Sequence, residues 1–195
     1  NNPSIGFAAQ AVLNLNGVTT EVIYPSCCGM PQLEQGNIQE VARSAEKIAK
    51  ELRSWVDDGN DIIALTPSCA LMLKFEWPLI LPENEDVRAL SGATFDIDEY
   101  IVAIAKKEGL ADGLQSLDGG VTLHHACHSR AQNFGQKSVD MLKYIPDLDL
   151  TVIERCSGHG GSWGMMKENF PSALKVGKPA ARQAKKASST YVASG

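Results

Sequence analysis

The chain has 195 residues, of which 44% are hydrophobic and 21% charged, a globular composition that excludes a disordered or fibrous protein. Its net charge of −5 argues against a nucleic-acid-binding surface over the whole chain. No run of about 18 apolar residues is present, so we expect no direct membrane span. The five cysteines are an odd number, which fits a secreted disulfide framework poorly and, in a reducing compartment, indicates metal binding or catalysis.

Helices and short apolar strands are predicted to alternate along the chain. Residues 38–52 place apolar side chains at helical spacing with charges between them, and residues 61–65 form an apolar run typical of a buried strand. This alternation favours an α/β fold of parallel sheets with flanking helices. The predicted helices are 2–16, 38–52, 98–107, 131–144 and 172–186, and the predicted strands are 19–24, 61–65, 121–125, 150–153 and 190–193.

The order of helix end, turn, strand and cysteine-containing loop occurs twice, in residues 11–29 and 141–158. The repeat indicates two similar domains, residues 1–115 and 116–195, divided where glycines cluster between residues 110 and 120. Because each copy lacks a different end, we also expect the chain to be a piece of a longer protein, cut inside the repeat at both ends.

All five cysteines follow predicted strands. In a parallel α/β unit the carboxyl ends of the strands meet at one edge of the sheet, so we expect these thiols to gather there. Several thiolates from separate loops suit a soft metal or an iron–sulfur cluster, and nearby glycines would let the backbone approach the cluster and donate N–H groups to its sulfurs. The candidate ligands are Cys27, Cys28, Cys69, Cys127 and Cys156, with Gly29 and Gly158 as the main backbone positions.

One segment, Pro25-Ser26-Cys27-Cys28-Gly29-Met30-Pro31, resembles the CCG signature of the cysteine-rich domain family. That family includes the heterodisulfide reductase subunit designated B, the anaerobic glycerol-3-phosphate dehydrogenase subunit designated C, and iron–sulfur subunits of glycolate and lactate oxidases. The resemblance covers nearly the whole chain as two consecutive domains. The glycerol-3-phosphate dehydrogenase type is matched further in segments 66–69, 124–128, 155–164 and 167–170.

The resemblance implies that each domain binds a [4Fe–4S]-type cluster through one cysteine, a Cys-Cys-Gly and a Cys-x-x-Cys. Three cysteines match the first domain and two match the second. Thr66 stands where the first cysteine of Cys-x-x-Cys is expected, and Ser157 replaces the second cysteine of the pair. A full set of four thiolates is therefore lacking in each half, and we expect this piece to hold clusters weakly or not at all.

The function implied is that of an iron–sulfur electron-transfer component of an oxidoreductase complex. Electrons would pass between a flavoprotein or ferredoxin-like partner and a thiol, a quinone or a similar acceptor. The expected location is the cytoplasm, with membrane association at its cytoplasmic face only through partner proteins. No catalytic residue is indicated.

Other interpretations remain open at this stage. The four histidines lie near the later cysteines, so Cys127, His128, Cys156 and His159 could bind zinc, although the close Cys-x-x-Cys spacing of zinc modules is missing. The loop from Gly158 could bind a dinucleotide, but its spacing is G-x-G-x-x-x-G. A cysteine nucleophile beside a histidine and simple burial of the cysteines are further alternatives. The basic helix face at residues 178–186 is either solvated or docks an acidic partner.

Overall fold

The computed structural model describes residues 3–160 and 162–195. Asn2, predicted to cap the first helix, and Gly161, in the glycine-rich loop, lie outside the described residues. Within these ranges no helix is both long and apolar enough to cross a membrane. The elements are α1 Pro3–Leu15, α2 Met30–Glu34, α3 Ile38–Asp57, β1 Ile62–Ala64, α4 Pro67–Leu71, a π-helical turn Met72–Glu76, α5 Trp77–Ile80, α6 Glu85–Ala93, β2 Thr94–Asp96, α7 Ile97–Lys107, β3 Val121–His124, α8 Cys127–Ala131, α9 Lys137–Leu142, β4 Leu150–Ile153, a 3₁₀ turn Trp163–Met165, α10 Phe170–Ala187 and β5 Tyr191–Ser194.

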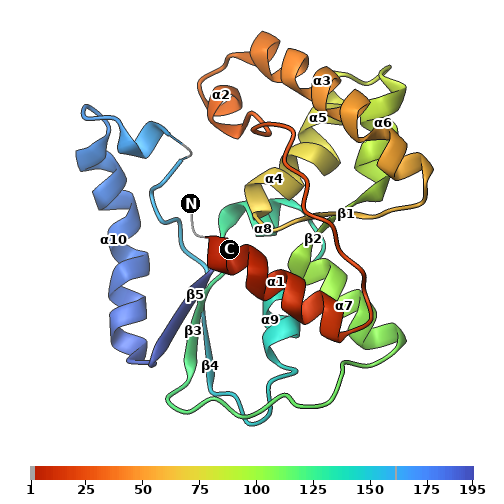
Figure 1. Cartoon of the computed structure of the whole chain (residues 1–195). Helices are drawn as coiled ribbons and strands as arrows, with labels where there is room; N and C mark the ends of the chain where they lie inside the picture. Colours follow the sequence, from red (N-terminus) through yellow and green to blue (C-terminus); the bar gives the residue numbers. More distant parts are fainter. Residues whose placement is uncertain (1–2, 161) are drawn as a thin grey trace.

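Two small parallel sheets organise these elements, so the predicted mixed α/β character is confirmed (Figure 1). In the N-terminal part of the chain, β1 pairs with β2, and Ile62 lies opposite Thr94. In the C-terminal part, β3 lies between β4 and β5 and pairs in parallel with both. The division into domains at residue 115 stays a prediction.

The main core lies in the N-terminal part, between α3 and the helices that follow β1. The apolar face of α3 is buried, as its helical spacing predicts, and the helix begins at Asn37, whose side chain accepts a hydrogen bond from the Glu40 N–H at 3.3 Å. Trp77 is completely buried in this core. Burial of each large apolar side chain contributes about 1.5–3 kcal/mol, so this cluster holds the loops that carry the first three cysteines.

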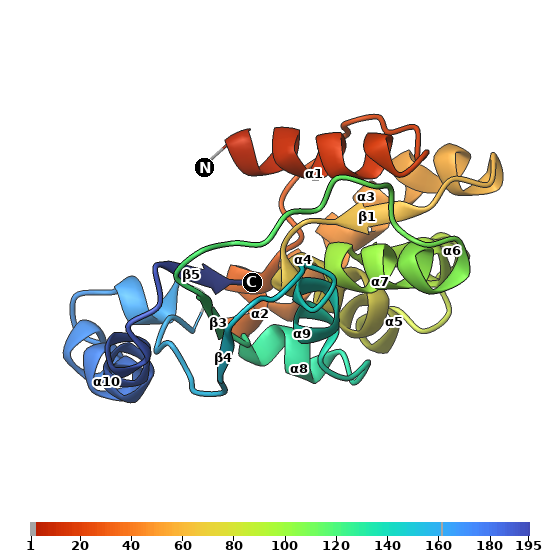
Figure 2. The same cartoon turned by 90° about the horizontal axis from the view of Figure 1, so that it is seen from below.

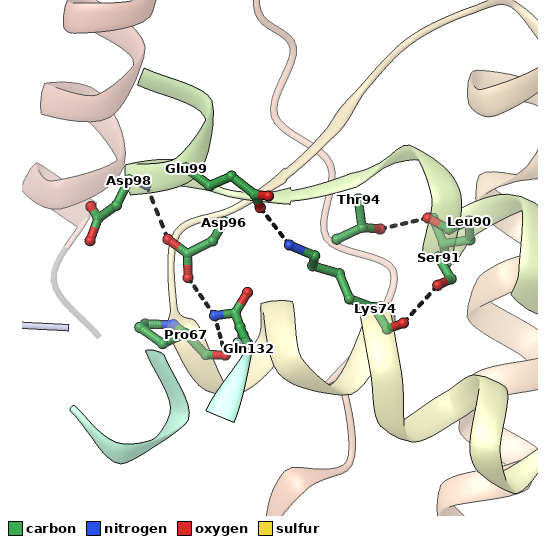
Figure 3. Close-up of polar contacts among 9 residues, drawn as sticks. All are labelled: Pro67, Lys74, Leu90, Ser91, Thr94, Asp96, Asp98, Glu99 and Gln132. Atoms are coloured by element: carbon green, nitrogen blue, oxygen red, sulfur yellow. Dashed lines mark hydrogen bonds and ion pairs between the residues drawn. The ribbon is translucent and has the colours of Figure 1, made fainter. Parts of the chain in front are cut away.

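A buried polar network joins the N-terminal part to the C-terminal part (Figure 3). Gln132 of the segment after α8 donates a hydrogen bond from Nε2 to Asp96 Oδ2 at 2.8 Å, and Asp96 Oδ1 accepts one from the Asp98 N–H at 3.0 Å. Lys74 forms an ion pair with Glu99 beside them. Asp96 is only 1% exposed, and burial raises the pKa of its carboxyl group above the ordinary value. The hydrogen bonds from Gln132 and from the Asp98 N–H offset part of the cost of burying this carboxyl group.

Two predicted elements are wrong. Residues 19–24 form no strand in the described chain, and Val22 and Tyr24 are 76% and 80% exposed. A strand requires a ladder neighbour, and β1 uses β2 instead. The predicted helix 131–144 is reduced to α9, since α8 already ends at Ala131 and both Asn133 and Gly135 adopt positive φ angles of 54° and 82°.

Candidate functional site

Cys27 and Cys28 lie in the turn that leads into α2. Gly29 has a φ of 86°, a left-handed conformation that L-residues adopt only with strain, and it starts the helix immediately after the cysteine pair. The backbone of Cys28 is fixed from the core, because the buried Trp77 Nε1–H donates a hydrogen bond to its carbonyl oxygen at 3.1 Å. Cys28 is consequently 8% exposed, whereas Cys27 is exposed.

Cys69 reaches the same place from another element. It is the third residue of α4, directly after β1, and its N–H donates to the Thr66 carbonyl at 2.9 Å. The Thr66 side chain caps no N–H group of α4. Cys69 is partly buried and packs against the core cluster that contains Cys28.

The position of Cys69 against the core cluster that contains Cys28 perturbs the pKa of both thiols. The pKa of Cys28 is raised well above the ordinary thiol value, first because its side chain hydrogen-bonds to Cys69 and then because it is buried. The pKa of Cys69 is lowered, because its sulfur accepts that hydrogen bond. Cys27 hydrogen-bonds to the Cys28 sulfur in turn. Cys69 is therefore the first of the pair to ionise, and a bound cation would displace the remaining protons.

The two later cysteines lie on the C-terminal sheet. Cys127 is the first residue of α8 and follows β3, while Cys156 follows β4, and both are exposed. The Cys156 sulfur accepts a hydrogen bond from the Gly158 N–H at 3.3 Å. In the described residues no hydrogen bond joins these two sulfurs to each other or to the first three. The structure thus groups Cys28 and Cys69 around one core, with Cys27 beside Cys28, whereas Cys127 and Cys156 follow strands of the other sheet.

Gly158 has a packing role that the sequence did not indicate. A Cβ atom at this position would lie 2.1 Å from the Ala173 carbonyl oxygen of α10, and its φ is +77°. At Gly177 of the same helix, a Cβ would lie 2.3 Å from the Ser157 carbonyl oxygen. Glycines on both sides therefore let the loop after Cys156 lie directly on α10, which holds the Gly158 N–H against the Cys156 sulfur.

Residues of the C-terminal part approach the segments that carry the first three cysteines. His128 Nδ1 lies 2.7 Å from the Ser68 hydroxyl, next to Cys69 in sequence. Gln35, which follows α2, donates a hydrogen bond to the Ser162 hydroxyl at 2.6 Å. These contacts and the Trp77 anchor are the site features that sequence reasoning missed. The motif around Cys127 gave the only available signal, since it predicted that His128 lies beside a cysteine.

The histidines do not form the zinc site considered from the sequence. His124 contacts the Ser194 hydroxyl at 2.9 Å and the Arg155 carbonyl oxygen at 2.6 Å, so its ring links β5 to the loop after β4. His125 is 2% exposed, and neither ring nitrogen has a hydrogen-bond partner among the described residues. Within the same ranges no three His, Cys, Asp or Glu side chains surround a point where a single metal ion could bind.

The donor set of the first site is chemically suited to an iron–sulfur cluster. It contains only sulfur, and its three thiols come from the loop before α2 and from helix α4, both of which pack on one core. A cluster spreads its thiolate ligands around several iron and sulfide atoms, so neighbouring sulfurs suit it better than a single ion. Three thiols are one fewer than the usual four, so the assignment of these cysteines as ligands stays a prediction.

Comparisons with known proteins found one similar family model and several similar proteins. Residues 1–74 match the model of the cysteine-rich domain family, CCG, which typically binds iron–sulfur clusters. Over 186 residues the chain is 28% identical to the anaerobic glycerol-3-phosphate dehydrogenase subunit designated C of Escherichia coli (strain K12), covering 94% of this chain and 46% of that protein. Over 162 residues it is 28% identical to lactate utilization protein A of Oceanobacillus iheyensis, covering 77% of this chain and 63% of that protein.

The chain therefore spans about half the length of the curated relatives it matches. The matched region 1–74 contains Cys27, Cys28 and Cys69, the three thiols that the structure brings together. Residues 1–74 are thus similar to the CCG cysteine-rich domain, and most of the chain is similar, at 28% identity, to that anaerobic glycerol-3-phosphate dehydrogenase subunit and to lactate utilization protein A.

Proposed function

We propose that the protein is an iron–sulfur electron-transfer component of an oxidoreductase complex. Its site would hold a [4Fe–4S]-type cluster, which supplies one-electron chemistry when bound. The observation that carries this proposal is the packing of Cys69 against the core cluster that contains Cys28, although the two residues lie 41 positions apart within the matched region, and Cys27 directly precedes Cys28. Cys127 and Cys156 would serve as ligands in the C-terminal part.

The residues around the thiols have defined tasks in this proposal. Trp77 holds the Cys28 backbone in place, so the ligand does not have to be ordered when the metal binds. The N–H groups of Met30 and Gly158 donate to the sulfurs of Cys28 and Cys156. Such bonds stabilise thiolate charge and would raise the reduction potential of a bound cluster.

The partners follow from the same proposal. One relative is named as a subunit of a dehydrogenase, which supports assembly with other subunits. We propose that electrons pass between a flavoprotein or ferredoxin-like partner and a thiol, a quinone or a similar acceptor. The lowered pKa of Cys69 supports its role as an iron ligand, because the thiolate is the form that binds iron.

Anaerobic reconstitution with iron and sulfide tests the proposal. The protein should bind both elements and turn brown, and dithionite should bleach its visible absorption reversibly. The double substitution of Cys28 and Cys69 by alanine should remove most of the iron from the N-terminal site, whereas Ser26→Ala, beside the pair but outside the thiol set, should retain it. Stoichiometric zinc without sulfide would overturn the proposal, and unchanged iron in the double variant would exclude these two ligands.

A further inference from the structure

Helix α10 is strongly basic in an acidic protein. Its sequence contains five basic residues and no acidic residue over Phe170–Ala187. The whole chain has 18 basic and 23 acidic residues, so the part outside α10 has 13 against 23 and a net charge of −10. The basic residues are Lys175, Lys178, Arg182, Lys185 and Lys186, here called the basic stripe.

The basic stripe faces away from the rest of the protein. Spacings of three and four residues place its members on one side of the helix. Ala173 and Gly177 lie on the opposite side and pack against the loop after Cys156. All five basic side chains are exposed, and none forms an ion pair with another residue in the described ranges. In both views α10 lies at one end of the molecule (Figures 1 and 2).

Helix α3, which occupies the corresponding place in the sequence repeat, provides a comparison for the charge pattern of a solvent-exposed helix face in this chain. It carries four basic and four acidic residues, and it pairs them along the helix, as Arg43 does with Glu40 and Arg53 with Asp57. Like charges three or four residues apart destabilise a helix, whereas opposite charges stabilise it. The basic stripe therefore weakens α10 by itself, and an acidic partner would offset that repulsion.

The stripe also lies close to a candidate ligand. The opposite side of α10 supports the Cys156 loop, so a protein bound to the stripe would be separated from that loop by about one helix diameter, ~10 Å. Four of the five residues are lysines, which are depleted from the buried cores of stable interfaces. A lysine-rich face suits a small, hydrated and transient contact, the type formed in electron-transfer encounters.

We propose that the basic stripe of α10 is the docking surface for an acidic, ferredoxin-like electron-transfer protein. This inference rests on the proposed function and identifies its partner by charge. The stripe increases the rate of encounter through electrostatic attraction, and it directs the partner to the side of the molecule that carries Cys156.

The test compares two charge-reversal variants with identical net charge and spacing. The stripe variant replaces Lys178, Arg182 and Lys185 by glutamate, and the control makes the same change at Arg43, Lys47 and Lys50 of α3. The probe is a plant-type [2Fe–2S] ferredoxin of net negative charge, with association measured by stopped flow at several salt concentrations. The stripe variant should associate at least ~10-fold more slowly at low salt and lose most of its salt dependence, and the control should stay within ~2-fold of wild type.

Equal losses in both variants would overturn the proposal, because net charge alone would then explain the effect. Binding to phosphatidylglycerol vesicles through the stripe, without binding of ferredoxin, would also overturn it. Iron and sulfide are measured in every variant, so failure of the cluster assignment is recognised separately. If the wild type holds no iron, equilibrium binding of ferredoxin to the metal-free protein still decides the docking claim.

Discussion

Replacing Gly158 by alanine should destabilise the protein through a clash with α10, beyond the strain that a left-handed residue carries. Gly36 provides a matched control, because both glycines have a φ of +77° and only Gly158 meets another part of the chain. An added Cβ finds nothing within 4 Å at Gly36, but at Gly158 it lies 2.1 Å from the Ala173 carbonyl oxygen. The difference between the two variants therefore isolates the packing of the loop on α10.

The expected magnitudes follow from these contacts. An alanine in the left-handed region costs about 1–2 kcal/mol, partly offset by about 0.4–1 kcal/mol from the reduced entropy of the unfolded chain. Gly36→Ala should thus lower the free energy of unfolding by about 1 kcal/mol. Overpacking adds about 1–3 kcal/mol, so Gly158→Ala should lower it by about 2–4 kcal/mol.

Urea unfolding followed by circular dichroism measures both values. With a denaturant dependence of about 2 kcal/mol per molar urea, the Gly158 variant should unfold at a midpoint about 0.5–1.5 M below that of the Gly36 variant. Equal losses in the two variants, within about 0.5 kcal/mol, would refute the close approach of the loop to α10. The Gly158 variant should also lose the N–H bond to the Cys156 sulfur.

Two further substitutions test the buried contacts. Burial raises the folded-state pKa of Asp96, so its ionisation weakens the fold as pH rises from about 4 through that raised pKa. Asp96→Asn removes this ionisation, so its stability relative to wild type should rise over the same pH range in urea titrations at several pH values. A difference in stability between the variant and wild type that does not change with pH would contradict this expectation. Trp77→Phe leaves the Cys28 carbonyl without its hydrogen-bond donor, so it should lower the free energy of unfolding by about 1–3 kcal/mol and reduce iron retention. The control is Trp55→Phe at the edge of the same core, which should retain iron. Equal iron retention in the two variants would show that Trp77 does not support the site.

Local patterns in the sequence predicted the elements whose stability is local. The alternation of apolar and charged residues that ends at Leu52 predicted α3, and the short apolar run from Leu150 to Ile153 predicted β4 with its exact bounds. The family resemblance also placed Cys28 and Cys69 in one domain, whereas the strand ends alone predicted that all five cysteines gather together. The structure brings their thiols together.

Features that depend on distant partners were not predictable. Residues 19–24 have the composition of a strand, but composition does not supply a neighbouring strand. The β2 strand has only three residues, and it forms because β1 lies beside it. The bond between Gln132 and Asp96 joins residues 36 positions apart, and the proximity of Gly158 to α10 depends on how the loop after β4 folds back.

Iron K-edge X-ray absorption on the anaerobically reconstituted protein tests cluster binding most directly. We predict that the first coordination shell of iron contains only sulfur, with iron–iron scattering at short distance, because thiolates and sulfide bind the metal. This signal should fall when Cys28 and Cys69 are replaced together by alanine. A first shell of nitrogen and oxygen, without iron–iron scattering, would show iron bound to surface carboxylates or histidines and would contradict the assignment of these thiols to a cluster.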